Sequence, residues 1–378
     1  MAIASVPACE VHGIVGSNAS LDDGGGAGGG TAVADGGPHA TDHEPDDGAG
    51  GGSGGGDGDP TTPGTVVFDV GAGDGVEVCL APQSSRCDHL GDDPWNALGV
   101  GCPGGFEADT SFFGDPRALH VLEGTLGTSG VYSPREGERM VILSTGRAAD
   151  LPRTHEELGC SDPLLCPSTG LAPLGPLPSL PVPIDVRAVD AVMTCADDPE
   201  LVGDGDCSNT LFSEWDAGAG AYDYAELRMR AKVPLEADAL VYEFAFFSAE
   251  YPLWTNQDSQ WNDMYVAWLE SEAWTGNVSF DELGHPISTN GVFLDYLDAD
   301  SPLCTEDPCV AAELDGFAMD GHAGTRWLET IAPVVPGEEI ELVLAIFDLT
   351  DAFFDTAVVL DGVHWGCTDL PPVTAPAG

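Results

Sequence analysis

The sequence contains very few basic residues. Only 11 of its 378 residues are lysine or arginine, against 64 aspartates and glutamates, and the formal net charge is −53. A surface this negative repels phosphate backbones and anionic lipids, which excludes nucleic acid as a partner and disfavours direct membrane binding. Such a surface attracts cations, calcium above all. The alternative is adaptation to high salt, in which an acidic surface is a general property and indicates no particular ligand or function.

Long apolar runs and familiar catalytic motifs are also missing. No run of 18 apolar residues occurs, so we expect no transmembrane span. Outside the glycine-rich leader there is no GxSxG, HExxH or P-loop motif. These absences favour a protein that is not an enzyme and has no organic cofactor.

The cysteines show no metal-binding spacing. Ten of the 11 lie in the body of the chain, and no two of them form a CxxC pair. An even number in a body rich in glycine and proline predicts disulfides, and therefore an oxidising compartment. The expected local pairs are Cys160–Cys166, Cys195–Cys207, Cys304–Cys309 and Cys87–Cys102, with Cys79 and Cys367 completing the set.

The remaining cysteine, Cys9, stands alone near the start. It follows an apolar run and a small residue in VPAC, the pattern around a bacterial lipoprotein cleavage site, where the cysteine receives lipid. The segment before it is too short for a working signal peptide. We expect membrane attachment through a lipid on Cys9, in an outer-membrane lipoprotein at the cell surface. The alternative is an ordinary exposed cysteine in a disordered leader.

Composition divides the chain into four parts. Residues 1–64 form a disordered, acidic, glycine-rich stalk that cannot bury enough apolar area to offset its ordering entropy. Residues 65–110 form a short cysteine-containing segment that packs on the main domain. Residues 111–370 form that domain, and residues 371–378 are expected to be a disordered tail.

The main domain has the pattern of an all-β protein. Leu240, Tyr242, Phe244 and Phe246 alternate with other mostly apolar residues, a period of two that is typical of a central strand buried on both faces. Similar runs recur between glycine and proline, and few segments have a helical repeat. The expected fold is a β-sandwich or jelly roll.

Five motifs resemble, in order, the choice-of-anchor L domain of secreted bacterial surface proteins. They are ILSTG (Ser144, Thr145, Gly146), FFSAEYP (246–252), WNDMYVAWLE (261–270), GNVSFDELGHPIS (276–288) and PGEEIELVLAIFDLTDAFFDTAVVLDG (336–362). The resemblance covers about residues 195–367 and extends weakly back to residue 95. It implies a β-sandwich displayed outside the cell, with no generally established activity. Anchors in the family are usually C-terminal, and this chain shows none there, which draws attention to Cys9.

Three of these motifs contain candidate metal ligands. The expected calcium ligands are Glu250, Asn262, Asp263, Asp348, Asp351 and Asp355. Calcium takes six to eight oxygens from carboxylates, amides and carbonyls on adaptable loops, and strand ends provide such loops. The alternative is that these side chains cap β-corners by bonding backbone amides.

Trp254 and Trp261 lie in the same loop region and can stack on a sugar or anchor a protein partner. The function expected from the sequence is therefore adhesion or matrix binding, to an extracellular polysaccharide or protein. Two alternatives remain open. One is a secreted polysaccharide hydrolase using carboxylates such as Glu243 and Glu250, and the other is a purely structural coat protein.

Overall fold

The computed structural model describes residues 80–82, 87–88, 91, 93–171, 175–186, 211–255, 261–291, 293–301, 303–305 and 308–378. All of them belong to one compact unit, Ala72–Gly378, and Met1–Gly71 form a separate unit outside the described residues. Cys9, Cys79, Cys195 and Cys207 also lie outside them. In the described part of the chain, no helix has the length and apolar character that a bilayer crossing requires.

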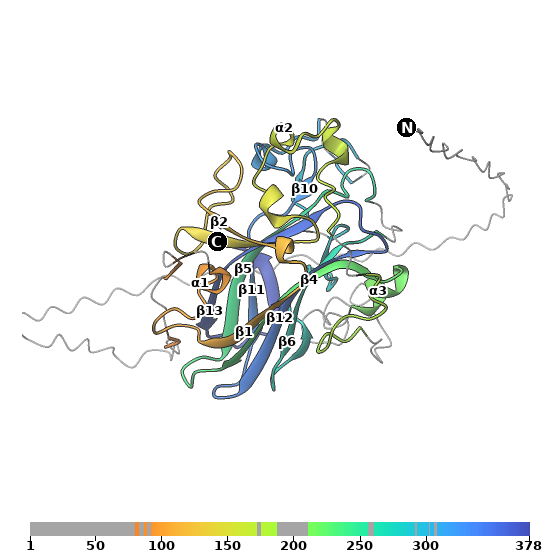
Figure 1. Ribbon diagram of the computed structural model, residues 1–378. Coiled ribbons are helices and arrows are strands. Elements are labelled where there is room, and N and C mark those ends of the chain that lie inside the picture. Colours follow the sequence, from red (N-terminus) through yellow and green to blue (C-terminus); the bar gives the residue numbers. More distant parts are fainter. Residues whose placement is uncertain are drawn as a thin grey trace, which may run out of the picture. The chain divides into compact units, whose positions relative to one another are not determined.

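The fold is all-β, as the sequence predicts, and consists mainly of two antiparallel sheets (Figure 1). The first sheet has the order β1 (Ala108–Phe113), β4 (Ala221–Lys232), β12 (Glu339–Leu349), β6 (Met264–Glu270) and β7 (Thr275–Asn277), with β8 (Ile287–Ser288) beside β6. The second has the order β14 (Val373–Pro376), β11 (Leu328–Pro333), β5 (Ala239–Ser248), β13 (Thr356–Gly366), β3 (Arg139–Ser144) and β2 (Leu119–Glu123). Strand β10 (Ala323–Gly324) pairs with β5 and with β9 (Tyr296–Leu297).

Helices are short and lie in the connections. The α-helices are α1 (Pro94–Ala97), α2 (His155–Leu158) and α3 (Phe212–Ala217), and the 3-10 turns are Pro116–Ala118, Ala148–Asp150, Pro163–Leu165 and Ala312–Leu314. Helix α2 has a capping box, in which the Thr154 hydroxyl accepts the Glu157 N–H and the Glu157 carboxylate accepts the Thr154 N–H. The chain therefore places its regular structure almost entirely in the sheets.

The main core lies between the two sheets. Leu227, Leu269 and Leu344 from the first sheet pack in one buried cluster with Phe244 and Phe246 from the second. Each fully buried side chain of this size contributes about 2 kcal/mol by leaving water. Strand β5 lies between β11 and β13 in its sheet, and its alternate residues are buried in clusters on the two opposite faces, which confirms the central strand expected from its alternation.

The outer faces of both sheets are covered as well. Phe247 and Val359 pack outside the second sheet with Phe317. Val343 and Phe347 pack outside the first sheet beneath Leu180 of the proline-rich segment.

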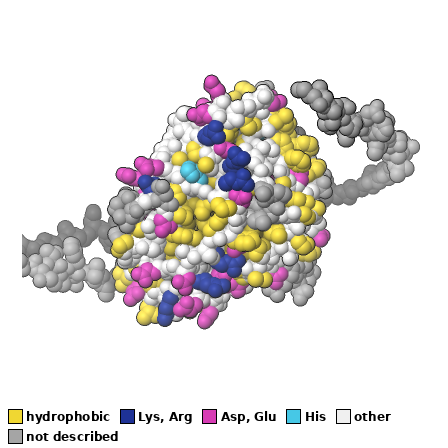
Figure 2. All heavy atoms as spheres, viewed as in Figure 1, with side chains coloured by type: hydrophobic (Ala, Val, Ile, Leu, Met, Phe, Trp, Pro, Cys, Tyr) yellow, Lys and Arg dark blue, Asp and Glu magenta, His cyan; other side chains and the backbone are white. Residues whose placement is uncertain are grey.

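On the face shown in Figure 2, basic and acidic side chains are interspersed.

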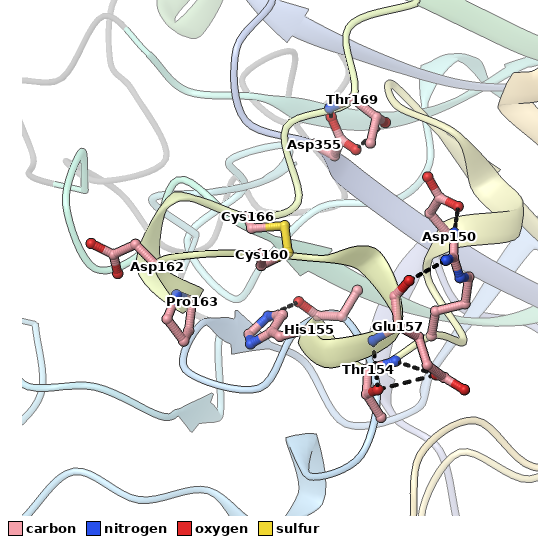
Figure 3. Close-up of a disulfide and its surroundings, with 12 residues drawn as sticks. Asp150, Thr154, His155, Glu157, Cys160, Asp162, Pro163, Cys166, Thr169 and Asp355 are labelled. Carbon is pink, nitrogen blue, oxygen red and sulfur yellow. Dashed lines mark hydrogen bonds and ion pairs between the residues drawn. A yellow bond between two sulfur atoms is a disulfide. The ribbon is translucent and has the colours of Figure 1, made fainter.

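Disulfides join three of the expected local pairs: Cys87–Cys102, Cys160–Cys166 and Cys304–Cys309. The second of these is drawn in Figure 3. Cys367 is disulfide-bonded as well. These bonds restrict the unfolded chain and indicate folding in an oxidising compartment.

The expectation of a disordered tail at residues 371–378 is wrong. Val373–Pro376 form β14, which pairs with β11 at the edge of the second sheet. The Thr374 side chain is buried, and its hydroxyl lies 2.8 Å from that of Thr330. Proline is tolerated in this strand because an edge strand needs fewer backbone donors.

Deleting residues 373–378 should therefore lower the free energy of unfolding, because it removes the pairing with β11 and exposes the neighbouring core. We expect the midpoint of urea unfolding to fall clearly. Thr374→Val, which keeps the strand and removes one hydroxyl, should cost only about 1 kcal/mol. An unchanged midpoint after the deletion would show that β14 adds no stability.

Candidate functional site

The apolar core ends in polar side chains at one end of the sandwich. Successive residues in a strand face opposite sides, so Ser248 follows Phe244 and Phe246 on the inner face of β5. The Ser248 hydroxyl accepts the backbone N–H of Glu250 at 3.2 Å, and the Glu250 side chain is also buried. The inward-facing side of β5 therefore changes from aromatic rings to a hydroxyl and a carboxylate.

The facing sheet changes in the same way. In β12, Asp348 follows Leu344 and Ile346 on the inner face, and in the segment entering β6, Asp263 precedes Tyr265. Both carboxylates are at most 4 % exposed. The two strands are neighbours, with Phe347 paired to Met264, which brings Asp348 and Asp263 close together.

A fourth buried carboxylate comes from β4. Asp223 lies where the register between β12 and β4 shifts, and its φ is +47°. A bulge turns a side chain away from its regular position, and aspartate tolerates this left-handed conformation better than most residues. We call Asp223, Glu250, Asp263 and Asp348 the acidic cluster.

Asp263 is the best-bonded member of the acidic cluster. Its Oδ1 accepts the N–H of Leu349 at 3.0 Å, and its Oδ2 accepts the Thr356 hydroxyl at 2.7 Å. The Asp348 carboxylate on the neighbouring strand is buried as well, and burial together with the charge of Asp263 raises the pKa of Asp348. Two buried carboxyl groups side by side are stabilised either by protonation or by a cation.

Three oxygens of the acidic cluster have no partner. Asp223 Oδ1, Glu250 Oε2 and Asp348 Oδ1 are buried without a hydrogen bond. Leaving a buried polar group unpaired costs about 1 to 3 kcal/mol, and more for a charged one. None of the ion pairs formed by the described residues includes a carboxylate of the cluster.

Asp361 shows the contrasting case of a buried carboxylate that is fully bonded. It is 0 % exposed, but its Oδ2 accepts the N–H groups of Arg135 and Glu136 and its Oδ1 accepts that of Gly362. Its role in the loop is explained by these bonds. The acidic cluster has no comparable set of donors.

Burial and mutual repulsion shift the protonation of the cluster. Loss of hydration raises the pKa of Asp223 to about 6. Burial, reinforced by neighbouring carboxylates, raises the pKa values of Glu250, Asp263 and Asp348 above their ordinary range. The cluster therefore holds protons near neutral pH unless a cation replaces them.

Two of the other expected calcium ligands, Asn262 and Asp355, are hydrogen-bonded to other partners. The Asn262 amide donates to Glu214 at 2.8 Å and accepts the N–H of Asn290 at 3.0 Å. The two oxygens of Asp355 accept the N–H and hydroxyl of Thr169, as Figure 3 shows. These two side chains hold loops in place, in the manner of the structural alternative.

Asp351 and the two tryptophans lie next to Glu250. Asp351 is half-buried and accepts the N–H of Phe353 at 3.1 Å. The rings of Trp254 and Trp261 pack edge to face at 5.3 Å. All four residues, Glu250 included, line one cavity.

One further acidic group, Asp298, Asp315 and Asp320, has carboxylate oxygens within 4.8 Å of one another. Two of these residues are exposed, and Asp298 already accepts the N–H groups of Ala311 and Gly321. The Asp298 carboxylate therefore already serves to hold this loop.

The expected hydrolase pair does not share a groove. Glu243 lies within β5 and forms a 2.9 Å ion pair with Arg135, whereas Glu250 follows the end of the strand. Glu243 and Glu250 are seven residues apart, and seven extended residues span roughly 23 Å. In a strand, two residues an odd number of positions apart point to opposite faces.

Comparison of the chain with protein-family models, with curated proteins and with solved structures finds no match.

The raised pKa values predict an unusual dependence of stability on pH. Because the folded state holds protons that the unfolded chain releases near pH 4, stability is fully present below that pH. It is lost as pH rises through the folded-state values, about 6 for Asp223. Each such proton lowers the free energy of unfolding by about 1.4 kcal/mol per pH unit. Urea unfolding in a chelator should therefore show stability falling from pH 5 to pH 8.

Asp348→Asn should make this decline shallower, since an amide needs no proton to be neutral. Burial raises the pKa of Asp361 to about 8. Asp361 therefore adds the same loss of stability with rising pH to both proteins, and its contribution cancels from the comparison. A stability that is constant or rises over this range would contradict the assignment.

Proposed function

We propose that the protein is an exported, non-catalytic ligand-binding β-sandwich whose acidic cluster binds a calcium ion. The observation that carries this proposal is the set of buried carboxylate oxygens without partners, namely Asp223 Oδ1, Glu250 Oε2 and Asp348 Oδ1. A divalent cation would satisfy these oxygens and remove the repulsion between their charges. No other donor among the described residues does so.

The ligand chemistry favours calcium. Calcium binds six to eight oxygens in adaptable geometry, whereas magnesium requires a near-ideal octahedron. The cluster provides carboxylate oxygens from four segments, and the hydroxyls of Ser248 and Thr356 lie beside them. The net charge of −53 raises the local concentration of cations.

A role outside the cell is supported by two observations. The disulfides favour an oxidising compartment. The five motifs that resemble the choice-of-anchor L domain are those of secreted surface proteins. On the basis of these motifs, we propose that the chain belongs to that family. A lipid on Cys9 and the acidic stalk would then hold the sandwich away from the membrane for adhesion or matrix binding.

Calcium should stabilise the wild-type protein. A ligand present at about a hundred times its Kd adds about 3 kcal/mol to the free energy of unfolding. Calorimetry in millimolar calcium should therefore give a higher Tm than calorimetry in a chelator. The increase in Tm should disappear in Asp348→Asn and in Glu250→Gln, and both variants should be at least as stable as wild type in the chelator, because an amide is neutral without taking up a proton.

Asp361→Asn is the matched control, since it alters a buried carboxylate that is already fully bonded. It should lower Tm equally with and without calcium. A wild-type Tm that is the same in calcium and in chelator would refute the calcium site. Turnover of a polysaccharide that Glu250→Gln abolishes would refute the non-catalytic assignment.

The lipid proposal has a separate test, because Cys9 lies outside the described residues. Mass spectrometry of the protein isolated from its native membrane fraction should show an N-terminal peptide that begins at a lipid-modified Cys9. Detection of an unmodified Met1 at the N-terminus would contradict this. The calcium measurements do not depend on the result.

A further inference from the structure

A cavity of about 340 Å³ opens beside the acidic cluster. Its walls come from the turn after β5, from Trp261 in the segment that enters β6, and from the loop that joins β12 to β13. It is lined by Glu250, Trp254, Trp261, Asp351, Phe353 and Phe354. The volume falls within the range of sites that bind small molecules.

Aromatic rings form most of the wall. Trp254 and Trp261 pack edge to face, with their ring planes inclined by 62°. The two rings therefore line the cavity in different orientations. Trp254 is 41 % exposed and Phe353 is 66 % exposed. Large aromatic side chains left in water around a hollow are a common feature of binding sites.

The remaining lining is acidic. Asp351 is held in position by the N–H of Phe353 and by a hydrogen bond with the Trp261 side chain. Glu250 contributes a second carboxyl group, and none of the described residues that line the cavity is a lysine, arginine or histidine. The carboxylate of Asp351 therefore lies at one side of a space whose other walls are mainly the faces and edges of π-systems.

From this combination we infer that the cavity binds an organic cation, namely a methylated ammonium group. Aromatic faces attract ammonium groups electrostatically, and methyl groups spread the charge over an apolar surface that fits such walls. Among the described lining residues, a neutral sugar would find two carboxyl groups to bond its many hydroxyls. A ligand that carries phosphate next to the ammonium would be repelled by the acidic surface.

The inference is independent of the calcium proposal. Asp351 and the four aromatic residues are outside the acidic cluster, and only Glu250 is shared. Loss of calcium binding in Asp348→Asn would therefore leave the aromatic walls in place. Conversely, loss of Trp254 leaves all four carboxylates of the cluster intact.

Choline is a suitable probe, and 3,3-dimethyl-1-butanol is its uncharged carbon analogue of the same shape. We expect isothermal titration of the full chain to show choline binding that is about tenfold tighter than binding of the neutral analogue. Phosphocholine should bind more weakly than choline, and a trimethyl-lysine peptide should bind if the natural ligand is a modified protein.

Trp254→Ala and Phe353→Ala should each weaken choline binding by about tenfold. Both residues are substantially exposed, so neither substitution should prevent folding. Leu253→Ala is the matched control, since Leu253 is 46 % exposed beside Trp254 but does not line the cavity, and it should leave affinity unchanged. Equal affinity for choline and its neutral analogue would overturn the inference. So would no choline binding at millimolar concentration, or saturable binding of an uncharged oligosaccharide instead.

Discussion

A carboxylate that leaves water must gain either hydrogen-bond donors or a positive charge, and one end of this sandwich depends on that requirement. Asp263 bonds the Leu349 N–H and the Thr356 hydroxyl, on either side of the loop that joins the two sheets. Its neighbours Asp348 and Glu250 lack such donors at one oxygen each. The strands that bury the aromatic core thus also bury the acidic cluster, and its charge must be balanced for the loops around it to keep their positions.

That dependence links the cluster to the cavity beside it. The backbone oxygen of Glu250 accepts the N–H of Trp254 at 2.9 Å, so the residue that faces the cluster also begins the turn that carries an aromatic wall. Asp351, which also lines the cavity, lies three residues beyond Asp348. A calcium ion bound by the cluster would hold both of these loops in place without contacting the organic cation. In the two proposals, the calcium site would stabilise the loop region and the cavity would recognise the ligand.

The sequence could predict those features whose determinants are local. The alternation from Leu240 to Phe246 was sufficient for a central strand, and close cysteine spacing was sufficient for three disulfides. Strand β14 was missed because VTAP is short and ends in proline, and its stability comes from pairing with a strand about 40 residues earlier in the chain.

The candidate site was only partly predictable because the direction of each side chain decides its membership. Asp355 precedes Thr356, whose hydroxyl bonds Asp263, and the alternation of a strand therefore turns Asp355 towards Thr169 instead. Asn262 likewise precedes Asp263 and bonds Glu214. Asp223 was missed because its position depends on a bulge between β4 and β12, and no pattern in the sequence marks it.

The most direct test of the central claim is a crystal structure of the protein grown in millimolar calcium, with anomalous scattering recorded to identify the ion. The account predicts an ion about 2.4 Å from Asp348 Oδ1 and Glu250 Oε2, with at least six oxygens around it. A cluster that holds only water or protonated carboxyl groups under these conditions would contradict it.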